Sequence, residues 1–306
     1  MSDDPSRRYP PAAPYVPDAW LARVARRPAE GGPSGAEWAR RARRIIVECL
    51  DRWNLVVTGP ASTGWTAVVL PVEQEGLPAA LKVGWPHVES AAEHTALQLW
   101  AGRGAARLLA ADPARGALLL ERLDPSRTLG GVDAFTACDI VGDLLRRLHL
   151  PAPPTIPSLA DHLLPQLERL DDPSVPRRFA ARTRALGAEL LVDERQNVVL
   201  HTDLHYENVL AGTREPWLAV DPKPFAGHPG FEFQPLLRNR VEELGTGSAL
   251  RWSVRHRLER AAEAAAVDLE EARLWTLLHT GLQILWARDD PEQASVHVAL
   301  FKALED

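Results

Sequence analysis

The sequence predicts an α+β protein of two lobes, with a small N-terminal lobe built on an antiparallel sheet with a helix and a larger, mainly helical C-terminal lobe. Short apolar segments separated by Gly- and Pro-containing turns run through residues 55–123. Segments with apolar residues at helical spacing prevail after residue 131. We expect an N-terminal lead and an amphipathic helix over residues 1–53, the small lobe over 54–123 and the large lobe over 124–306.

The spacing of apolar residues and the turn residues predict the helices and strands of each lobe. Residues 5–17 are rich in proline and predict an extended lead, and the Arg-rich segment 36–53 predicts a helix. In the small lobe, the clearest strand pair is 107–111 with 117–121, on either side of a turn at 112–116. In the large lobe, helical spacing predicts helices over 132–150, 158–170, 176–191, 249–266, 269–288 and 291–304.

The most informative segment is the polar loop from His201 to Asn208. Asp203 and Asn208 are separated by four residues, which is the spacing of the catalytic loop in metal-assisted phosphoryl transfer. In such a loop the Asp accepts the proton of the acceptor hydroxyl and the Asn amide oxygen binds Mg²⁺. The spacing therefore predicts that Asp203 is a catalytic base and Asn208 a metal ligand.

A second metal ligand is expected at Asp221. Residues 209–211 and 217–220 predict two short strands joined by a turn at 212–216, and this hairpin would return Asp221 to Asn208. Mg²⁺ needs few protein ligands, because it keeps waters and takes other oxygens from the nucleotide phosphates.

Two other interpretations of the loop remain open at this point. Polar residues of this kind also cap turns and satisfy backbone groups without any chemistry. The two histidines, His201 and His205, could instead bind zinc in a metal hydrolase. The upstream half of the chain has to separate these alternatives.

That half contains a candidate phosphate-binding lysine. Lys82 ends an apolar strand-like stretch and is one of only three lysines, beside Lys223 and Lys302, in a chain that is rich in Arg. An ammonium acts on phosphate oxygens as a compact point charge, a task distinct from that of the planar Arg fork. Glu89 or Glu93 could pair with it, and we prefer Glu93, because it lies a turn deeper into the expected helix.

Two further segments complete the expected nucleotide site. The stretch 58–64 is a glycine-containing turn between strands, in which backbone amides around Ser62 and Gly64 could cradle phosphate, although an ordinary hairpin turn explains it equally well. From Glu121 to Leu123 the chain leaves the sheet, where the main chain of a two-lobed kinase would hydrogen-bond adenine.

These strings together resemble the aminoglycoside phosphotransferase family, in the branch of streptomycin 6-phosphotransferases and hydroxyurea phosphotransferases. The resemblance spans residues 52–240 and rests on four segments: 80–86, 116–123, 201–210 and 215–224. It implies a protein-kinase-like fold, ATP and Mg²⁺ as cofactors, Asp203 as base, Asn208 and Asp221 on Mg²⁺, and Lys82 on the phosphates. It also implies transfer of phosphate to an antibiotic hydroxyl, with the streptomycin 6-hydroxyl as the first candidate and hydroxyurea or another hydroxylated metabolite as the alternative. A nucleotide-binding regulator without catalysis is a third hypothesis, and the presence of Asp203 argues against it, because a pure binder has no need of a base.

Two positions depart from the family pattern. Thr202 stands where the family often has Gly or Trp, and Pro222-Lys223 follows Asp221 where protein kinases have Phe-Gly. The second departure is usual for this branch and indicates a metabolite kinase without a mobile activation segment.

Composition sets the remaining expectations. A formal charge of −6 disfavours a nucleic-acid partner and suits a cationic small molecule. Cys49 and Cys138 lie far apart in helical segments, which predicts two buried reduced thiols in a cytoplasmic protein. The N-terminus has no apolar export signal, and no stretch is apolar enough to span a bilayer.

A cationic acceptor needs ionised carboxylates, and an aromatic face can add to its binding. The main candidates for such carboxylates are Glu207, Glu242 and Asp289. Glu232 is expected to order the segment after the metal site, and His205 to hold the shape of its loop, instead of binding substrate. Other residues near the expected pocket are Glu243, Asp290, Trp252, Trp275 and Trp286.

Overall fold

The structure is a computed structural model that describes residues 16–192 and 197–305. The expected lead over residues 5–17 lies mostly outside these ranges. The chain divides into two compact units. Unit 1 comprises the described residues up to Gly102 together with Ala106–Leu123, and unit 2 comprises Arg103–Ala105 and the residues from Asp124 onward. Each unit is described by itself.

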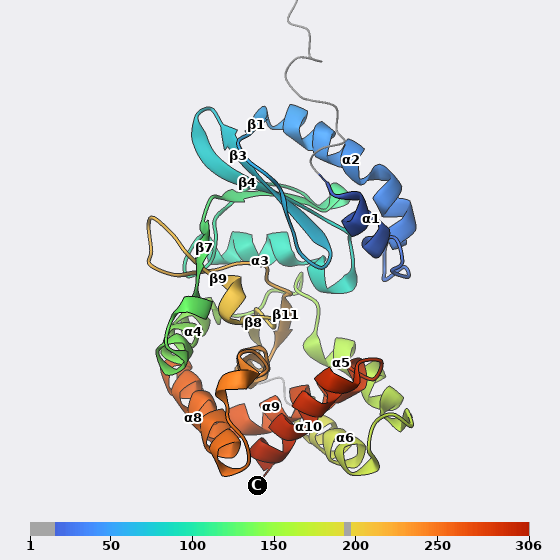
Figure 1. The fold of residues 1–306 in the computed structure, drawn as a ribbon, viewed down its shortest axis with the longest axis vertical. Helices are drawn as coiled ribbons and strands as arrows, with labels where there is room; N and C mark the ends of the chain where they lie inside the picture. The colour runs from blue at the N-terminus through green and yellow to red at the C-terminus, as the bar shows by residue number, and fades with distance from the viewer. Residues whose placement is uncertain (1–15, 193–196, 306) are drawn as a thin grey trace, which may run out of the picture. The chain divides into compact units, whose positions relative to one another are not determined.

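Unit 1 is a twisted antiparallel sheet with helices (Figure 1). Its strand order is β1-β3-β4-β6-β5, and β2 pairs with β3 at one end. The helices are α1 (Asp18–Val24), α2 (Gly35–Arg52) and α3 (Glu93–Trp100). The strands are β1 (Leu55–Val57), β2 (Ser62–Thr63), β3 (Ala67–Gln74), β4 (Leu77–Gly84), β5 (Leu108–Asp112) and β6 (Ala117–Glu121).

Alternation of side chains explains how this sheet acquires its core. Along β3 the buried positions are Val68, Leu70 and Val72, which face the same side because successive residues of a strand point to opposite faces. The apolar stripe of α2 packs on that side with Ile46 and Leu50 fully buried. A capping box at Ser34 and Glu37 begins α2.

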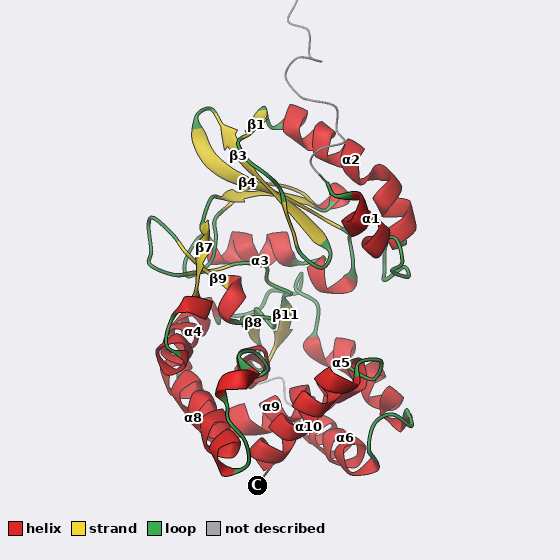
Figure 2. Cartoon of the chain, in the orientation of Figure 1, coloured by secondary structure: helices red, strands yellow, loops and turns green. Residues whose placement is uncertain are grey.

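Unit 2 is mainly helical, as Figure 2 shows. Its long helices are α4 (Ala134–Leu148), α5 (Leu159–Glu168), α6 (Arg177–Leu190), α8 (Ser248–Ala265), α9 (Leu269–Trp286) and α10 (Pro291–Glu305), and α7 (Gln234–Leu237) is a single turn. Its strands are short: β7 (Asp124–Thr128), β8 (Val198–Leu200), β9 (Val209–Ala211), β10 (Leu218–Ala219) and β11 (Phe225–Gly227).

Most elements agree with those the sequence predicts. All six long helices of unit 2, the strand pair β5–β6 and the hairpin β9–β10 are confirmed, with ends shifted by a few residues. The sequence did not predict α1, β7 or the antiparallel pair β8–β11. The strands of that pair are three residues each and far apart in sequence, so neither periodicity nor a turn signal marks them.

Both cysteines are free and buried, as expected. Burial raises the pKa of the Cys49 thiol to about 11 and that of Cys138 to about 12, because a thiolate loses hydration there. None of the helices that the structure describes is both long and apolar enough to cross a membrane.

The packing of α4 on α8 tests this architecture, and the two helices run side by side in Figure 1. A Cβ at Gly142 would lie 2.4 Å from the carbonyl oxygen of Ala261. We therefore expect Gly142→Ala to lower the free energy of unfolding by about 1–3 kcal/mol, as overpacking usually does, in spite of the better helix propensity of Ala. Urea denaturation measures this change. Gly131→Ala is the control, because nothing lies within 4 Å of its Cβ position, and equal stability of the two variants would contradict the predicted contact.

Candidate active site

The loop from His201 to Asn208 is framed by the two short strand pairs of unit 2. The pair β8–β11 aligns Leu200 with Phe225, so His201 and Pro224 leave the same end of that pair. The pair β9–β10 aligns Val209 with Ala219. Residues 201–208 and 220–224 are thereby brought beside each other.

Asp203 is buried and carries a cation on each carboxylate oxygen. The Arg238 guanidinium lies 2.6 Å from Oδ1, and the Lys223 ammonium lies 2.7 Å from Oδ2. Burial alone would raise the pKa of this carboxyl group, but the Lys223 and Arg238 cations outweigh it, and the pKa falls below its usual value. Asp203 is therefore ionised at neutral pH, as a general base must be.

The backbone of the loop is held by a carboxylate that is distant in sequence. Glu232, which is fully buried, accepts hydrogen bonds from the amide N–H of His201 at 2.6 Å and of Thr202 at 2.8 Å. It lies in the 3-10 helix Pro229–Phe233, and His149 Nε2 lies 3.6 Å from it. These contacts give Glu232 a structural role in holding this loop.

Thr202 adopts a left-handed backbone conformation with φ of 56°. A β-branched residue is rarely found there, at a cost on the order of 1–3 kcal/mol. Two bonds hold it in place, the one from its N–H to Glu232 and one from its Oγ1 to the carbonyl oxygen of Lys223 at 2.6 Å. Glycine would adopt this conformation without strain.

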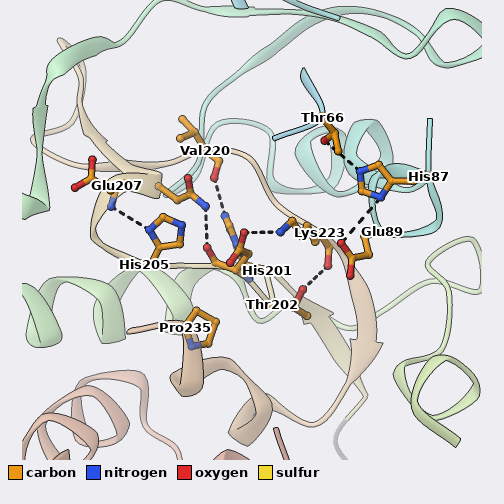
Figure 3. Close-up of polar contacts among 12 residues, drawn as sticks. Thr66, His87, Glu89, His201, Thr202, His205, Glu207, Val220, Lys223 and Pro235 are labelled. Carbon is orange, nitrogen blue, oxygen red and sulfur yellow. Dashed lines mark hydrogen bonds and ion pairs between the residues drawn. The ribbon is translucent and has the colours of Figure 1, made fainter. Parts of the chain in front are cut away.

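The two histidines of the loop bind backbone groups. His201 Nε2 donates to the carbonyl oxygen of Val220 at 3.0 Å, and its Nδ1 accepts from the Asp203 N–H. His205 Nδ1 accepts from the Glu207 N–H, as Figure 3 shows. Both His201 ring nitrogens are thus engaged, which is incompatible with the zinc interpretation. Burial lowers both histidine pKa values, that of His205 to about 4, so both rings are neutral at pH 7.

Asn208 and Asp221 fit a divalent cation. The Asn208 side-chain amide donates to the carbonyl oxygen of Asp203 at 2.9 Å, which fixes the orientation of its amide oxygen. The backbone N–H of Val220 donates to the Asn208 carbonyl oxygen, so the exposed Asp221 follows next to it. An amide oxygen and a carboxylate are ligands that Mg²⁺ accepts. Within residues 16–192 and 197–305, no three His, Cys, Asp or Glu side chains gather as a metal site.

In unit 1, Lys82 and Glu93 form a buried ion pair at 2.5 Å. The prediction that Glu93 pairs with Lys82 is confirmed. The predicted reason, that Glu93 lies a turn deeper into the helix than Glu89, is wrong. α3 begins at Glu93, and Glu89 lies in a separate 3-10 helix, Val88–Ser90. Glu93 is therefore in the first turn of its helix, where a carboxylate is also favoured by the helix dipole.

The glycine-containing turn is an ordinary hairpin. Ser62 pairs with Val69 across β2 and β3, and the Gly64 N–H donates to the carbonyl oxygen of Ala67 at 2.8 Å. The expectation that the Gly64 amide cradles phosphate is corrected, since that donor is already used. The Gly64 carbonyl oxygen accepts from Trp20 Nε1 and from Arg23 of α1, both at 2.8 Å.

At the end of β6, the Glu121 N–H donates to the carbonyl oxygen of Arg107 at 3.0 Å, and its carboxylate accepts from the Arg107 N–H. The Glu121 N–H is therefore committed to the sheet. Leu123 is buried just beyond it.

The candidate substrate carboxylates lie in different parts of unit 2. Glu207 is exposed beside Gly130, and Glu242 is exposed in the 3-10 helix Val241–Glu243. Asp289 pairs with Arg288, whose guanidinium also approaches Asp172. Glu243 binds Arg240 and Arg257, and Asp290 accepts from the Gln293 N–H. The structure does not gather these acidic residues into one cluster.

The three tryptophans differ as well. Trp275 is buried and stacks on His228. Trp286 packs edge-on against His279. Trp252 is exposed and contacts Phe135 and His256.

Comparison with known proteins assigns the family. Residues 52–291 match the model of the aminoglycoside/hydroxyurea antibiotic resistance kinases. The chain belongs to this family. It is 42% identical to a hydroxyurea phosphotransferase of Kitasatospora aureofaciens, over 90% of this chain and 85% of that protein, and 37% identical to a streptomycin 6-kinase of Streptomyces griseus, over 94% and 97%.

The fold of the family is confirmed by a solved structure. A choline/ethanolamine kinase family protein from Mesorhizobium loti superposes with a TM-score of 0.59 at 16% identity, over 86% of this chain and 95% of that one. The two-lobed protein-kinase-like fold predicted from the sequence is therefore confirmed.

The contact between Glu232 and the loop is open to a direct test. Glu232→Gln keeps the size of the side chain. Its amide NH₂ then lies opposite one of the two backbone N–H groups and cannot accept a hydrogen bond from it. We expect the free energy of unfolding to fall by about 2 kcal/mol, since a hydrogen bond to a charged acceptor is lost inside the protein. Turnover should fall while the KM for ATP changes less. Denaturation and steady-state kinetics check this, with the exposed Glu263→Gln as control. Stability and turnover equal to that control would contradict this role.

Proposed function

We propose that this protein is an ATP-dependent kinase that transfers the γ-phosphoryl group to a hydroxyl group of streptomycin and so confers resistance. The observation that supports it most is the buried, ionised Asp203 on a loop fixed by Glu232, five positions before Asn208. Such a carboxylate can orient the acceptor hydroxyl and accept its proton. The family and its named relatives support the substrate class.

The other residues have supporting roles in this proposal. Lys82, held by Glu93, would bind nucleotide phosphates as a point charge. The backbone at Leu123 would meet adenine, since the Glu121 N–H is committed to the sheet. Asn208 and Asp221 would hold Mg²⁺, which neutralises charge on the phosphates when bound. Because the reaction needs ATP, we expect the enzyme to act in the cytoplasm.

Hydroxyurea is the second candidate acceptor, and a specific observation favours it. Asp203 has two cations on its carboxylate, Lys223 and Arg238, so two positive charges lie against its single negative charge. A neutral acceptor meets no repulsion from them, whereas a polycationic aminoglycoside needs compensating carboxylates such as Glu207 and Glu242.

Direct observation of phosphoryl transfer decides between the acceptors. We expect ³¹P NMR to show a phosphate ester of streptomycin when Mg²⁺ and ATP are supplied, and turnover should fall by roughly 10²–10⁴ in Asp203→Asn because the base is lost. Asp51→Asn, at an exposed position of α2 to which no role is assigned, serves as the surface-carboxylate control. A product with hydroxyurea alone would establish the second candidate. ATP-dependent transfer unaffected by Asp203→Asn would remove Asp203 from the role of base.

A further inference from the structure

Lys223 has a position that the roles above do not explain. Its ammonium contacts Asp203, and its backbone is tied to the catalytic loop on both sides. The Lys223 N–H donates to the carbonyl oxygen of His201 at 3.0 Å, and the Lys223 carbonyl oxygen accepts from Thr202 Oγ1 at 2.6 Å. These two bonds fix its Cα beside the base, two residues after Asp221. A lysine that served only solubility would not need such anchoring.

The choice of lysine at this position is itself informative. The chain has three lysines among 35 basic residues, so Arg is the usual cation wherever charge alone is needed. Arg238 already supplies that charge to Asp203 at 2.6 Å. An ammonium has three donors in a tetrahedral arrangement, so it can keep one bond to Asp203 and direct another to a second anion. The Lys223 side chain is about one-third exposed, which leaves it accessible to a ligand.

We propose that Lys223 is a further catalytic residue, whose ammonium binds the phosphoryl group as it passes from ATP to the acceptor hydroxyl. This inference rests on the proposed kinase function. In the reaction the bond from the γ-phosphorus to the β–γ bridging oxygen breaks and its electron pair leaves with ADP. The acceptor oxygen forms the new bond to phosphorus, and its proton goes to Asp203. Lys223 stabilises the negative charge on the peripheral phosphoryl oxygens, while Arg238 holds Asp203 in place.

The first test measures binding and does not need an acceptor. ADP with aluminium fluoride and Mg²⁺ imitates the phosphoryl group in transfer. We expect Lys223→Met to weaken binding of aluminium fluoride to the ADP complex on the order of 10²-fold, the usual effect of losing one such electrostatic donor, and to leave ADP binding unchanged. Lys302→Met, at the exposed third lysine on α10, should bind both as the parent does. Unchanged ADP binding also shows that the variant is folded.

A second test separates phosphoryl binding from an indirect effect through Asp203. If Lys223 acted only on Asp203, adding Lys223→Met to Asp203→Asn would cause no further loss of aluminium fluoride binding or of turnover. We expect the double variant to lose more than Asp203→Asn alone, and Lys223→Arg to recover only part of the loss, since a planar fork replaces the compact ammonium. Parental aluminium fluoride binding in Lys223→Met would overturn the inference. If the parent protein transfers phosphate to neither streptomycin nor hydroxyurea but Lys223→Met still weakens aluminium fluoride binding, the proposed acceptors are wrong and the role of Lys223 stands.

Discussion

The catalytic loop depends on the buried carboxylate of Glu232, which accepts the backbone N–H groups of His201 and Thr202. A loop that carries a buried base has to satisfy its own backbone donors, because an unpaired buried N–H costs about as much as a lost hydrogen bond. One carboxylate satisfies two of them. It also holds Thr202 in its left-handed conformation, and Asp203 follows directly from that residue. The position of Asp203, the proposed base, is therefore set by a contact between segments 31 residues apart.

The charges around Asp203 follow from the same arrangement. His201 and His205 are kept neutral by burial, so the cations that act on Asp203 are Lys223 and Arg238. They compensate the cost of burying the carboxylate and keep it ionised. A base with a lowered pKa is a weak proton acceptor, which suits phosphoryl transfer, where the transition state is loose and positioning contributes more than deprotonation.

The sequence predicted the parts of the site whose geometry is local. The spacing of Asp203 and Asn208, the hairpin before Asp221 and the strand that carries Lys82 all follow from short-range patterns, and so do the long amphipathic helices. Contacts between distant segments were harder to predict. Nothing near Arg238 marks it as a partner of Asp203, and the pairing of β8 with β11, which brings Lys223 to the loop, has no signal in sequence. The role of Gly64 was uncertain because a phosphate loop and a hairpin turn share the same residues.

The account is tested most directly by residue-resolved amide hydrogen exchange of the loop. If Glu232 holds the backbone, the amides of His201 and Thr202 should exchange as slowly as that of Val199 in β8, whose N–H donates to the carbonyl oxygen of Leu150. In Glu232→Gln, exchange at His201 and Thr202 should accelerate while Val199 stays protected, because local openings expose only the backbone groups that lost their acceptor. Rapid exchange of His201 and Thr202 in the parent protein, at the rate of an exposed loop, would contradict the central role assigned to Glu232.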